Sequence, residues 1–219
     1  GPNGRGISSP LPLAFVLLRN PVRENAKETF AYFHAQGVTV KVISGDNPVT
    51  VSAAAREAGI EGADRYVDAS TLETYEDIEA ACEEYNVFGR VKPNQKKLLI
   101  QALQSNKHTV AMTGDGVNDV LALKEADCSV AMASGSDVAA QISDLVLMNS
   151  DFSSMPSVVA EGRRVINNIE RAASLYLVKN IFSLILAVIS ITAVFSYPLS
   201  PSQLTLMSLL SIGIPSLIL

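Results

Sequence analysis

The two aspartates of a glycine-bracketed turn are the residues of this chain best suited to chemistry. Asp115 and Asp119 lie in Thr113-Gly114-Asp115-Gly116-Val117-Asn118-Asp119, directly after the apolar run 109–112. An apolar run without alternation, followed at once by a breaker, is typical of a buried parallel strand. Asp115 is therefore expected at the carboxyl end of a strand, where open α/β sheets bind ligands. Paired carboxylates with room for water suit Mg²⁺, although they could also serve turn formation and helix capping.

Two weaker polar clusters follow other expected elements. Ser44-Gly45-Asp46 comes after the strand-like run 38–43, and its hydroxyl and backbone N–H groups could hold a phosphate oxygen at the start of the next helix. Lys96 lies early in a helix that begins at Pro93, where its ammonium could neutralise phosphate charge. A plain turn and a solvated surface lysine are the respective alternatives. Together with the aspartates, these groups make a phosphoryl-transfer set that lacks a nucleophile.

The elements that must position these groups alternate between strand and helix. Such alternation predicts an α/β fold with a parallel, doubly wound sheet and helices on both faces. The strand-like runs are 13–18, 38–43, 87–91, 109–112, 129–132 and 145–148. The expected helices cover 22–36, 48–59, about 70–84, 93–105 and 118–126. Asn47 and Pro48 are expected to start the second helix, and a capping box of Ser70 and Glu73 to start the third.

Composition excludes some classes of function. The net charge of −5 over 219 residues gives no basic footprint for nucleic acid, so no nucleic-acid partner is expected. Cys82 and Cys128 fit no metal or redox spacing, which favours reduced thiols. The chain shows no signal peptide and lacks an initiating Met, so we expect a fragment of a longer protein.

The C-terminal part of the chain is more apolar than the rest. Residues 175–197 are apolar with Lys179 as their only charge, which is long enough for a transmembrane helix. A turn at 198–201 leads to a second apolar segment, 203–219, which is slightly short of a full crossing. Arg163, Arg164 and Arg171 precede the first segment and place residues 1–174 in the cytoplasm by the positive-inside tendency. The alternative is an apolar hairpin buried in a large soluble protein.

These motifs, in this order, resemble the P-type (E1–E2) cation-transporting ATPases, whose phosphorylation domain has the haloacid dehalogenase-like, Rossmann-type fold. The turn from Thr113 to Asp119 resembles the hinge motif of that family, and Ser44-Gly45-Asp46 resembles its Thr-Gly-Asp motif. The remaining likenesses are Asn20-Pro21-Val22-Arg23, Arg90-Val91-Lys92-Pro93 leading to Lys96, Glu161-Gly162-Arg163, and Asn167-Asn168 in the stalk before the fifth transmembrane helix.

The resemblance implies a role for each matched position. ATP phosphorylates an aspartate in an Asp-Lys-Thr-Gly-Thr motif, which does not occur in these 219 residues. Mg²⁺ ligation is implied for Asp115, Asn118 and Asp119. Contacts with the phosphoryl group are implied for Lys96 and for Ser44 with Gly45, and nucleotide positioning and domain closure for Asp46 and Arg23.

The implied organisation is a partial phosphorylation domain at 1–152, a stalk helix at 153–174, the fifth transmembrane helix at 175–197 and part of the sixth at 203–219. Candidates for contact with the transported cation are Asn180, Ser183, Lys179, Gly213 and Pro215. Ser183 stands where calcium and sodium pumps of the family carry an acidic ligand, so the ion is not specified. Lys179 has two interpretations, an intramembrane functional group or a side chain that extends to the interface. Pro215 frees backbone carbonyls that could line a cavity.

The implied function is cation transport across the cell membrane, driven by ATP hydrolysis through an aspartyl phosphate, in a multi-pass protein. The partners are the remainder of the pump (actuator, nucleotide-binding domain, other transmembrane helices), the lipid bilayer and a cation, and the fragment alone is expected to be inactive. Three alternatives remain. They are a truncated non-catalytic paralogue that regulates a pump, a soluble haloacid dehalogenase-type phosphatase, and a lipid flippase of the same superfamily.

Overall fold

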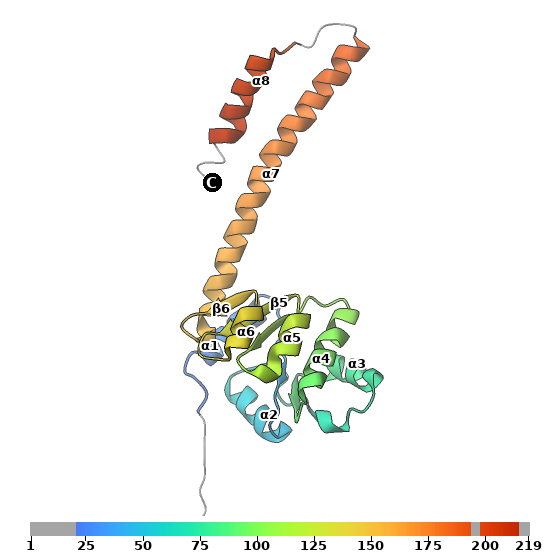
Figure 1. Ribbon diagram of the computed structural model, residues 1–219, viewed down its shortest axis with the longest axis vertical. Coiled ribbons are helices and arrows are strands. Elements are labelled where there is room, and N and C mark those ends of the chain that lie inside the picture. The colour runs from blue at the N-terminus through green and yellow to red at the C-terminus, as the bar shows by residue number, and fades with distance from the viewer. Residues whose placement is uncertain (1–20, 194–197, 215–219) are drawn as a thin grey trace, which may run out of the picture. The chain divides into compact units, whose positions relative to one another are not determined.

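The structure is a computed structural model that describes residues 21–193 and 198–214 (Figure 1). It contains two compact units, Gly1–Ser153 and Ser154–Leu219, which are considered separately. The strand expected at 13–18 lies outside the described residues.

The first unit is built on parallel strands. One three-stranded sheet has the order β1-β3-β2, with β1 at Val42–Ile43, β2 at Tyr66–Asp68 and β3 at Val87–Gly89. The other has the order β4-β5-β6, with β4 at Ala111–Gly114, β5 at Cys128–Met132 and β6 at Leu145–Leu147. The predicted parallel α/β class is confirmed, but the described strands form two sheets, with β1 and β4 each at an edge of its own sheet.

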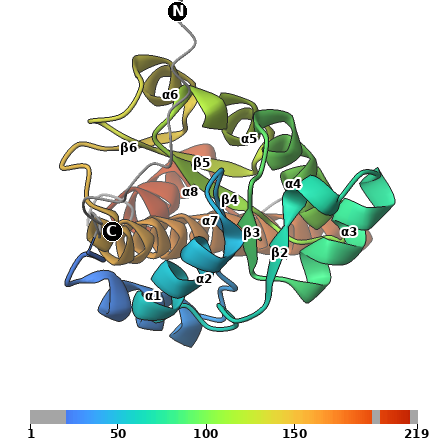
Figure 2. The ribbon, with the colours of Figure 1, turned by 90° about the horizontal axis from the view of Figure 1, so that it is seen from below.

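Helices flank the strands on both sides. Figure 2 shows α3 to α6 grouped along one side and α1 and α2 along the other. The α-helices among the described residues of this unit are α1 (Ala26–Ala35), α2 (Pro48–Glu57), α3 (Tyr75–Glu84), α4 (Pro93–Ser105), α5 (Val120–Glu125) and α6 (Asp137–Ile142). Their apolar faces close over the strands around Phe88, Leu99, Ile100 and Leu123, which are at most 2% exposed. This packing fixes the loops at the carboxyl ends of the strands.

Some local predictions were wrong. The box of Ser70 and Glu73 does not start α3, because the Asp68 carboxylate accepts bonds from the Ser70 amide and hydroxyl and holds Ser70 in a 3₁₀ turn. Thr74 caps α3 instead, accepting from the Asp77 amide while the Asp77 carboxylate accepts from the Thr74 amide. Strand β2 and helix α6 were not predicted. The cap of Asn47 on α2 is confirmed, with the Val49 amide donating to its side chain at 3.0 Å.

The second unit contains α7 (Met155–Thr192), α8 (Pro201–Ser208) and a π-helical turn, η4 (Leu209–Gly213), that contacts α7. The expected stalk and the first apolar segment therefore form one continuous helix as far as Thr192. Within the described residues, Phe152–Thr192 is the one helix long and apolar enough to cross a membrane, judged by length and composition, and 6% of its apolar window is buried.

Candidate functional site

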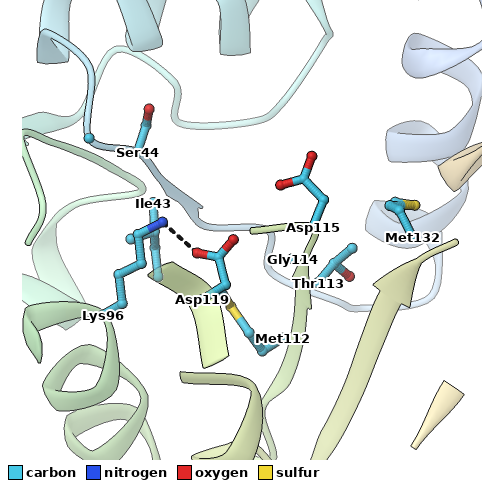
Figure 3. Close-up of a pocket in the computed structure, with 10 residues that line it drawn as sticks. Ile43, Ser44, Lys96, Met112, Thr113, Gly114, Asp115, Asp119 and Met132 are labelled. Atoms are coloured by element: carbon cyan, nitrogen blue, oxygen red, sulfur yellow. Dashed lines mark hydrogen bonds and ion pairs between the residues drawn. The ribbon is translucent and has the colours of Figure 1, made fainter. Parts of the chain in front are cut away.

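A cleft of about 390 Å³ lies at the carboxyl ends of β1 and β4, where the sequence predicted a site. Its walls include Ser44, Gly45, Lys96, Asp115 and Asp119, so the structure brings the three predicted clusters together (Figure 3). The cleft is formed because the loops after two edge strands meet the first turn of α4, which carries Lys96.

Lys96 and Asp119 form a buried ion pair at the base of the cleft. The lysine Nζ donates to Asp119 Oδ1 at 2.6 Å, and the two side chains are 13% and 10% exposed. Asp119 Oδ2 also accepts from the Gly116 amide at 3.2 Å. The alternative of a solvated surface lysine is therefore wrong, because both charged groups are withdrawn from water and paired.

Gly114 makes this close arrangement possible. A Cβ added at position 114 would lie 2.7 Å from the Cβ of Asp119, nearer than real Cβ contacts come. The end of β4 and the turn that carries Asp119 can therefore approach only where the strand residue lacks a side chain.

Asp115 differs from Asp119 in its surroundings. It is exposed, and its carboxylate makes no hydrogen bond or ion pair with any residue that the structure describes. Figure 3 shows the carboxylate and the Ser44 hydroxyl pointing toward the same side of the cleft. The two aspartates, four positions apart, thus have different surroundings. The Asp119 carboxylate is paired with Lys96, whereas the Asp115 carboxylate is accessible to a ligand.

Ser44 is held by the backbone of the neighbouring strand. Its amide donates to the Phe88 carbonyl at 2.9 Å and its carbonyl accepts from the Val91 amide at 3.0 Å. The Ser44 hydroxyl accepts from the Asp46 amide at 3.2 Å, which turns the chain toward the start of α2. The hydroxyl and the Gly45 backbone therefore reach the cleft from a fixed position.

The other predicted site residues of this unit lie outside the cleft. Asp46 and Asn118 are exposed and do not line it. Arg23 donates to the Ser150 carbonyl at 3.1 Å and lies 3.5 Å from Asp151. Hydrogen bonds from Ser153 lower the pKa of Asp151, and Arg23 contributes less to the same shift.

The donor set of the cleft fits Mg²⁺. No group of three or more His, Cys, Asp or Glu side chains that could hold a metal exists among the described residues, so an all-protein cage is not present there. Mg²⁺ is commonly held by one or two carboxylates, with water and substrate phosphate completing its shell. The exposed, unpaired Asp115 carboxylate supplies that kind of ligand. The assignments of Asn118 and Asp119 as further ligands stay predictions.

One feature of the site was missed from the sequence. The Ser136 amide donates to the Asp115 carbonyl at 2.7 Å, and Gly135 lies against the same backbone. The signal was available, because Ser134-Gly135-Ser136 is a polar, glycine-containing run just after β5, as Ser44-Gly45-Asp46 is after β1.

The candidate cation contacts belong to the second unit. Lys179, Asn180 and Ser183 lie on α7, where Lys179 and Ser183 are half-buried and Asn180 is exposed. Gly213 ends the π-helical turn, a distortion of the helix that is frequent at functional sites. Pro215 lies outside the described residues.

Comparison with known proteins gives a consistent picture. Residues 5–127 match the haloacid dehalogenase-like hydrolase family. A probable cation-transporting ATPase, exp7, of Streptococcus pneumoniae is 48% identical in an alignment 215 positions long, which covers 94% of this chain and 28% of that protein. The calcium-transporting ATPase CtpE of Mycobacterium tuberculosis is 48% identical in an alignment 219 positions long, which covers 95% of this chain and 27% of that protein.

The fold is also found in a solved structure. A zinc-transporting PIB-type ATPase in the E2·Pi state aligns with a TM-score of 0.65 and 22% identity, over 91% of this chain and 27% of that one. The chain thus spans 27–28% of the length of these three proteins.

Proposed function

The chain belongs to the haloacid dehalogenase-like hydrolases, and from that premise we propose that its cleft is the phosphoryl-transfer site of a P-type cation-transporting ATPase. The observation that carries the proposal is the pairing of Lys96 with Asp119 beside the carboxylate of Asp115, which has no partner among the described residues. A phosphoryl group needs positive charge, hydrogen-bond donors and a metal-binding carboxylate within reach of one another. The cleft gathers these groups from three separate segments.

The residues divide the work between them. Asp119 holds the Lys96 ammonium in a fixed position, so that its remaining N–H donors can meet phosphoryl oxygens without reorganisation. Ser44 and the Gly45 amide, which also line the cleft, would provide further hydrogen bonds to the phosphoryl group. Asp115 would hold Mg²⁺, which when bound would neutralise charge on the transferred phosphoryl group.

The nucleophile is the group that the cleft lacks. We propose that the nucleophile is an aspartate in a segment outside these 219 residues. This segment would lie between the edge strands β1 and β4. Both strands are edge strands in the described part of the chain, and Ile43 of β1 and Met112 of β4 line the same cleft. A parallel strand added there would place its carboxyl end among Ser44, Lys96 and Asp115. That aspartate would accept the phosphoryl group from ATP and later release it to water.

The second unit would couple this chemistry to transport. We propose that α7 crosses the cell membrane as one of several spans, with residues 1–174 in the cytoplasm and the apolar segments 175–197 and 203–219 in the bilayer. Exposed apolar side chains on α7, such as Leu184 and Ile191 at 64% and 77% exposure, support contact with lipid or other spans. Ca²⁺ is the cation to test first, since a calcium-transporting relative is 48% identical. Its candidate contacts remain Asn180, Ser183, Lys179, Gly213 and Pro215.

The test is phosphorylation of the whole pump. Membranes that contain it, incubated with Mg²⁺ and γ-labelled ATP, should form an acid-stable phosphoenzyme that hydroxylamine cleaves. The 219-residue chain alone, purified in detergent, should form none, because it lacks the nucleophile. Absence of labelled phosphoenzyme in the whole pump at any cation concentration would refute the proposal, and hydrolysis of phosphate esters by the isolated chain would favour a phosphatase.

A further inference from the structure

The loop between β5 and α6, residues 133–136, contacts the backbone of Asp115. The Ser136 amide donates to the Asp115 carbonyl at 2.7 Å. A Cβ added to Gly135 would lie 2.4 Å from that carbonyl oxygen and 2.9 Å from the Asp115 Cα. Both neighbours are backbone atoms, so a side chain at position 135 could be accommodated only if the Asp115 backbone moved.

This contact matters because nothing else described fixes the Asp115 carboxylate. Asp119 is held through its side chain by Lys96 and Gly116, whereas the carboxylate of Asp115 has no protein partner among the described residues. The direction of an unpartnered carboxylate is set by its backbone and its rotamer. The position of the Asp115 backbone therefore decides where its oxygens lie.

We infer that Gly135 and the Ser136 amide are positioning residues that set the metal-binding geometry of Asp115. The inference rests on the proposed role of Asp115 as a Mg²⁺ ligand. It is of the kind seen at other metal sites, where groups behind the ligand fix its orientation and affinity. Neither Gly135 nor Ser136 lines the cleft itself, so both would act on a ligand only through Asp115.

The loop is itself anchored at each residue. The Ala133 amide donates to the Leu147 carbonyl at 3.1 Å, and the Gly135 amide donates to the Met132 carbonyl at 3.0 Å. The Ser134 amide donates to the Ser150 hydroxyl at 2.8 Å. These bonds tie the loop to the ends of β5 and β6 and to Ser150 in the turn after β6, so the loop can act as a rigid support for Asp115.

Arg23 extends the support. It donates to the Ser150 carbonyl, and Ser150 adopts a left-handed backbone conformation with φ of 51°. A non-glycine residue in that conformation is strained unless its surroundings hold it. The contacts of Arg23 and Ser134 with Ser150 supply that restraint, and they connect Arg23 through Ser150 to residues 134–136, whose Ser136 amide bonds to the Asp115 carbonyl.

The test measures Mn²⁺ binding to the purified 219-residue chain by electron paramagnetic resonance, with Mn²⁺ alone as the probe. Two variants remove the support in different ways. Gly135→Ala introduces the Cβ clash, and Gly162→Ala, at a helical glycine with no atom within 4 Å of its added Cβ, is its control. Ser136→Pro removes the amide donor at a residue whose φ of −73° proline can adopt, and Ser136→Ala keeps the amide while removing the same hydroxyl.

The expected result is that Gly135→Ala and Ser136→Pro weaken Mn²⁺ binding by about tenfold or more, the range seen when groups behind a metal ligand are lost. Gly162→Ala and Ser136→Ala should bind like wild type. Thermal unfolding is recorded for every variant. If Gly135→Ala does not fold, the comparison of Ser136→Pro with Ser136→Ala tests the inference. Equal Mn²⁺ affinity of folded Ser136→Pro and Ser136→Ala would overturn the inference.

Mn²⁺ binding by Asp115→Asn distinguishes failure of the inference about the loop from failure of the proposed metal role of Asp115. If wild type binds Mn²⁺ and Asp115→Asn does not, the metal role of Asp115 stands whatever the loop variants show. If wild type and Asp115→Asn bind Mn²⁺ equally, the metal role is refuted and the inference falls with it.

Discussion

The Lys96 ammonium and the Asp119 carboxylate lie 2.6 Å apart in the base of the cleft, although 23 residues separate them in the sequence. The contact joins the first turn of α4 to the turn that follows β4. The Asp119 carboxylate, which also accepts from the Gly116 amide, thus holds the Lys96 ammonium in place. The pair is therefore a structural element of the cleft as well as a part of its chemistry.

Removing one member of this pair should destabilise the fold. Lys96→Met leaves a buried carboxylate without its cation, which is expected to lower the free energy of unfolding by about 3 kcal/mol. The same change in an Asp119→Asn background should cost less, because the amide carries no charge. Pulse proteolysis in urea measures the four corners of this cycle. Additive effects of the two substitutions would show that the pair contributes nothing.

The cap of α3 gives a test of local structure. Thr74→Ala removes the acceptor of the Asp77 amide and should cost about 1 kcal/mol, the usual effect of losing an N-cap. Glu73→Ala is the matched control, because the Glu73 side chain takes no part in the capping box. The two free energies of unfolding are compared by urea titration. A larger effect of Glu73→Ala would favour the cap expected from the sequence.

The two cysteines should differ in reactivity. Cys82 is fully buried, and burial raises the pKa of its thiol to about 11. At pH 8 only about one molecule in a thousand then carries the reactive thiolate. Cys128 is half-buried, and burial raises its pKa as well. Iodoacetamide followed by mass spectrometry should label Cys128 first in the native chain, and early labelling of Cys82 would contradict the described core.

Acid should remove the contribution of the ionised Asp144 carboxylate to the stability of the fold. Its carboxylate accepts from the Ser129 amide and hydroxyl, each at 2.8 Å, and these bonds lower its pKa below the usual 3.8. A carboxyl with a lowered folded-state pKa stabilises the fold above its unfolded pKa, and the stabilisation is lost as the pH falls through the folded value.

Asp144→Asn should therefore be less stable than wild type at pH 7, with the difference shrinking below about pH 4. Thermal unfolding between pH 7 and pH 2.5 measures it, with exposed Asp64→Asn as the control. A difference that stayed constant across this range would show that the ionised carboxylate is not the cause.

The sequence predicted which side chains line the cleft better than it predicted the strands that carry them. Polar residues directly after apolar runs pointed to Ser44 and Asp115, and Lys96 was expected early in the helix after the run 87–91; all three line one cleft, because parallel strands bring their carboxyl ends to one edge. The same rule applied to the run after β5 would have found Gly135, whose role appears only when the loop is seen against the Asp115 backbone. Different roles for Asp115 and Asp119 could not be predicted either, because spacing does not reveal which carboxylate meets Lys96.

The errors have local physical causes. Ser70 has the right spacing to Glu73 for a capping box. The amide and hydroxyl of Ser70 instead donate to the Asp68 carboxylate, so the box does not form. Strand β2 is three residues long and α6 only six, too short for periodicity to be recognised. The division of the strands into two sheets depends on contacts between distant segments, which a single sequence does not display.

The most direct test of the central claim is the Mg²⁺ dependence of phosphoenzyme formation in the whole pump, compared between Asp115→Asn and Asp64→Asn. Asp64 is exposed and lies outside the cleft, so its variant controls for loss of one carboxylate. If Asp115 holds Mg²⁺, Asp64→Asn should follow the wild-type Mg²⁺ titration, whereas Asp115→Asn should form little phosphoenzyme even at saturating Mg²⁺. Phosphorylation of Asp115→Asn to the wild-type level, at the wild-type Mg²⁺ concentration, would contradict it.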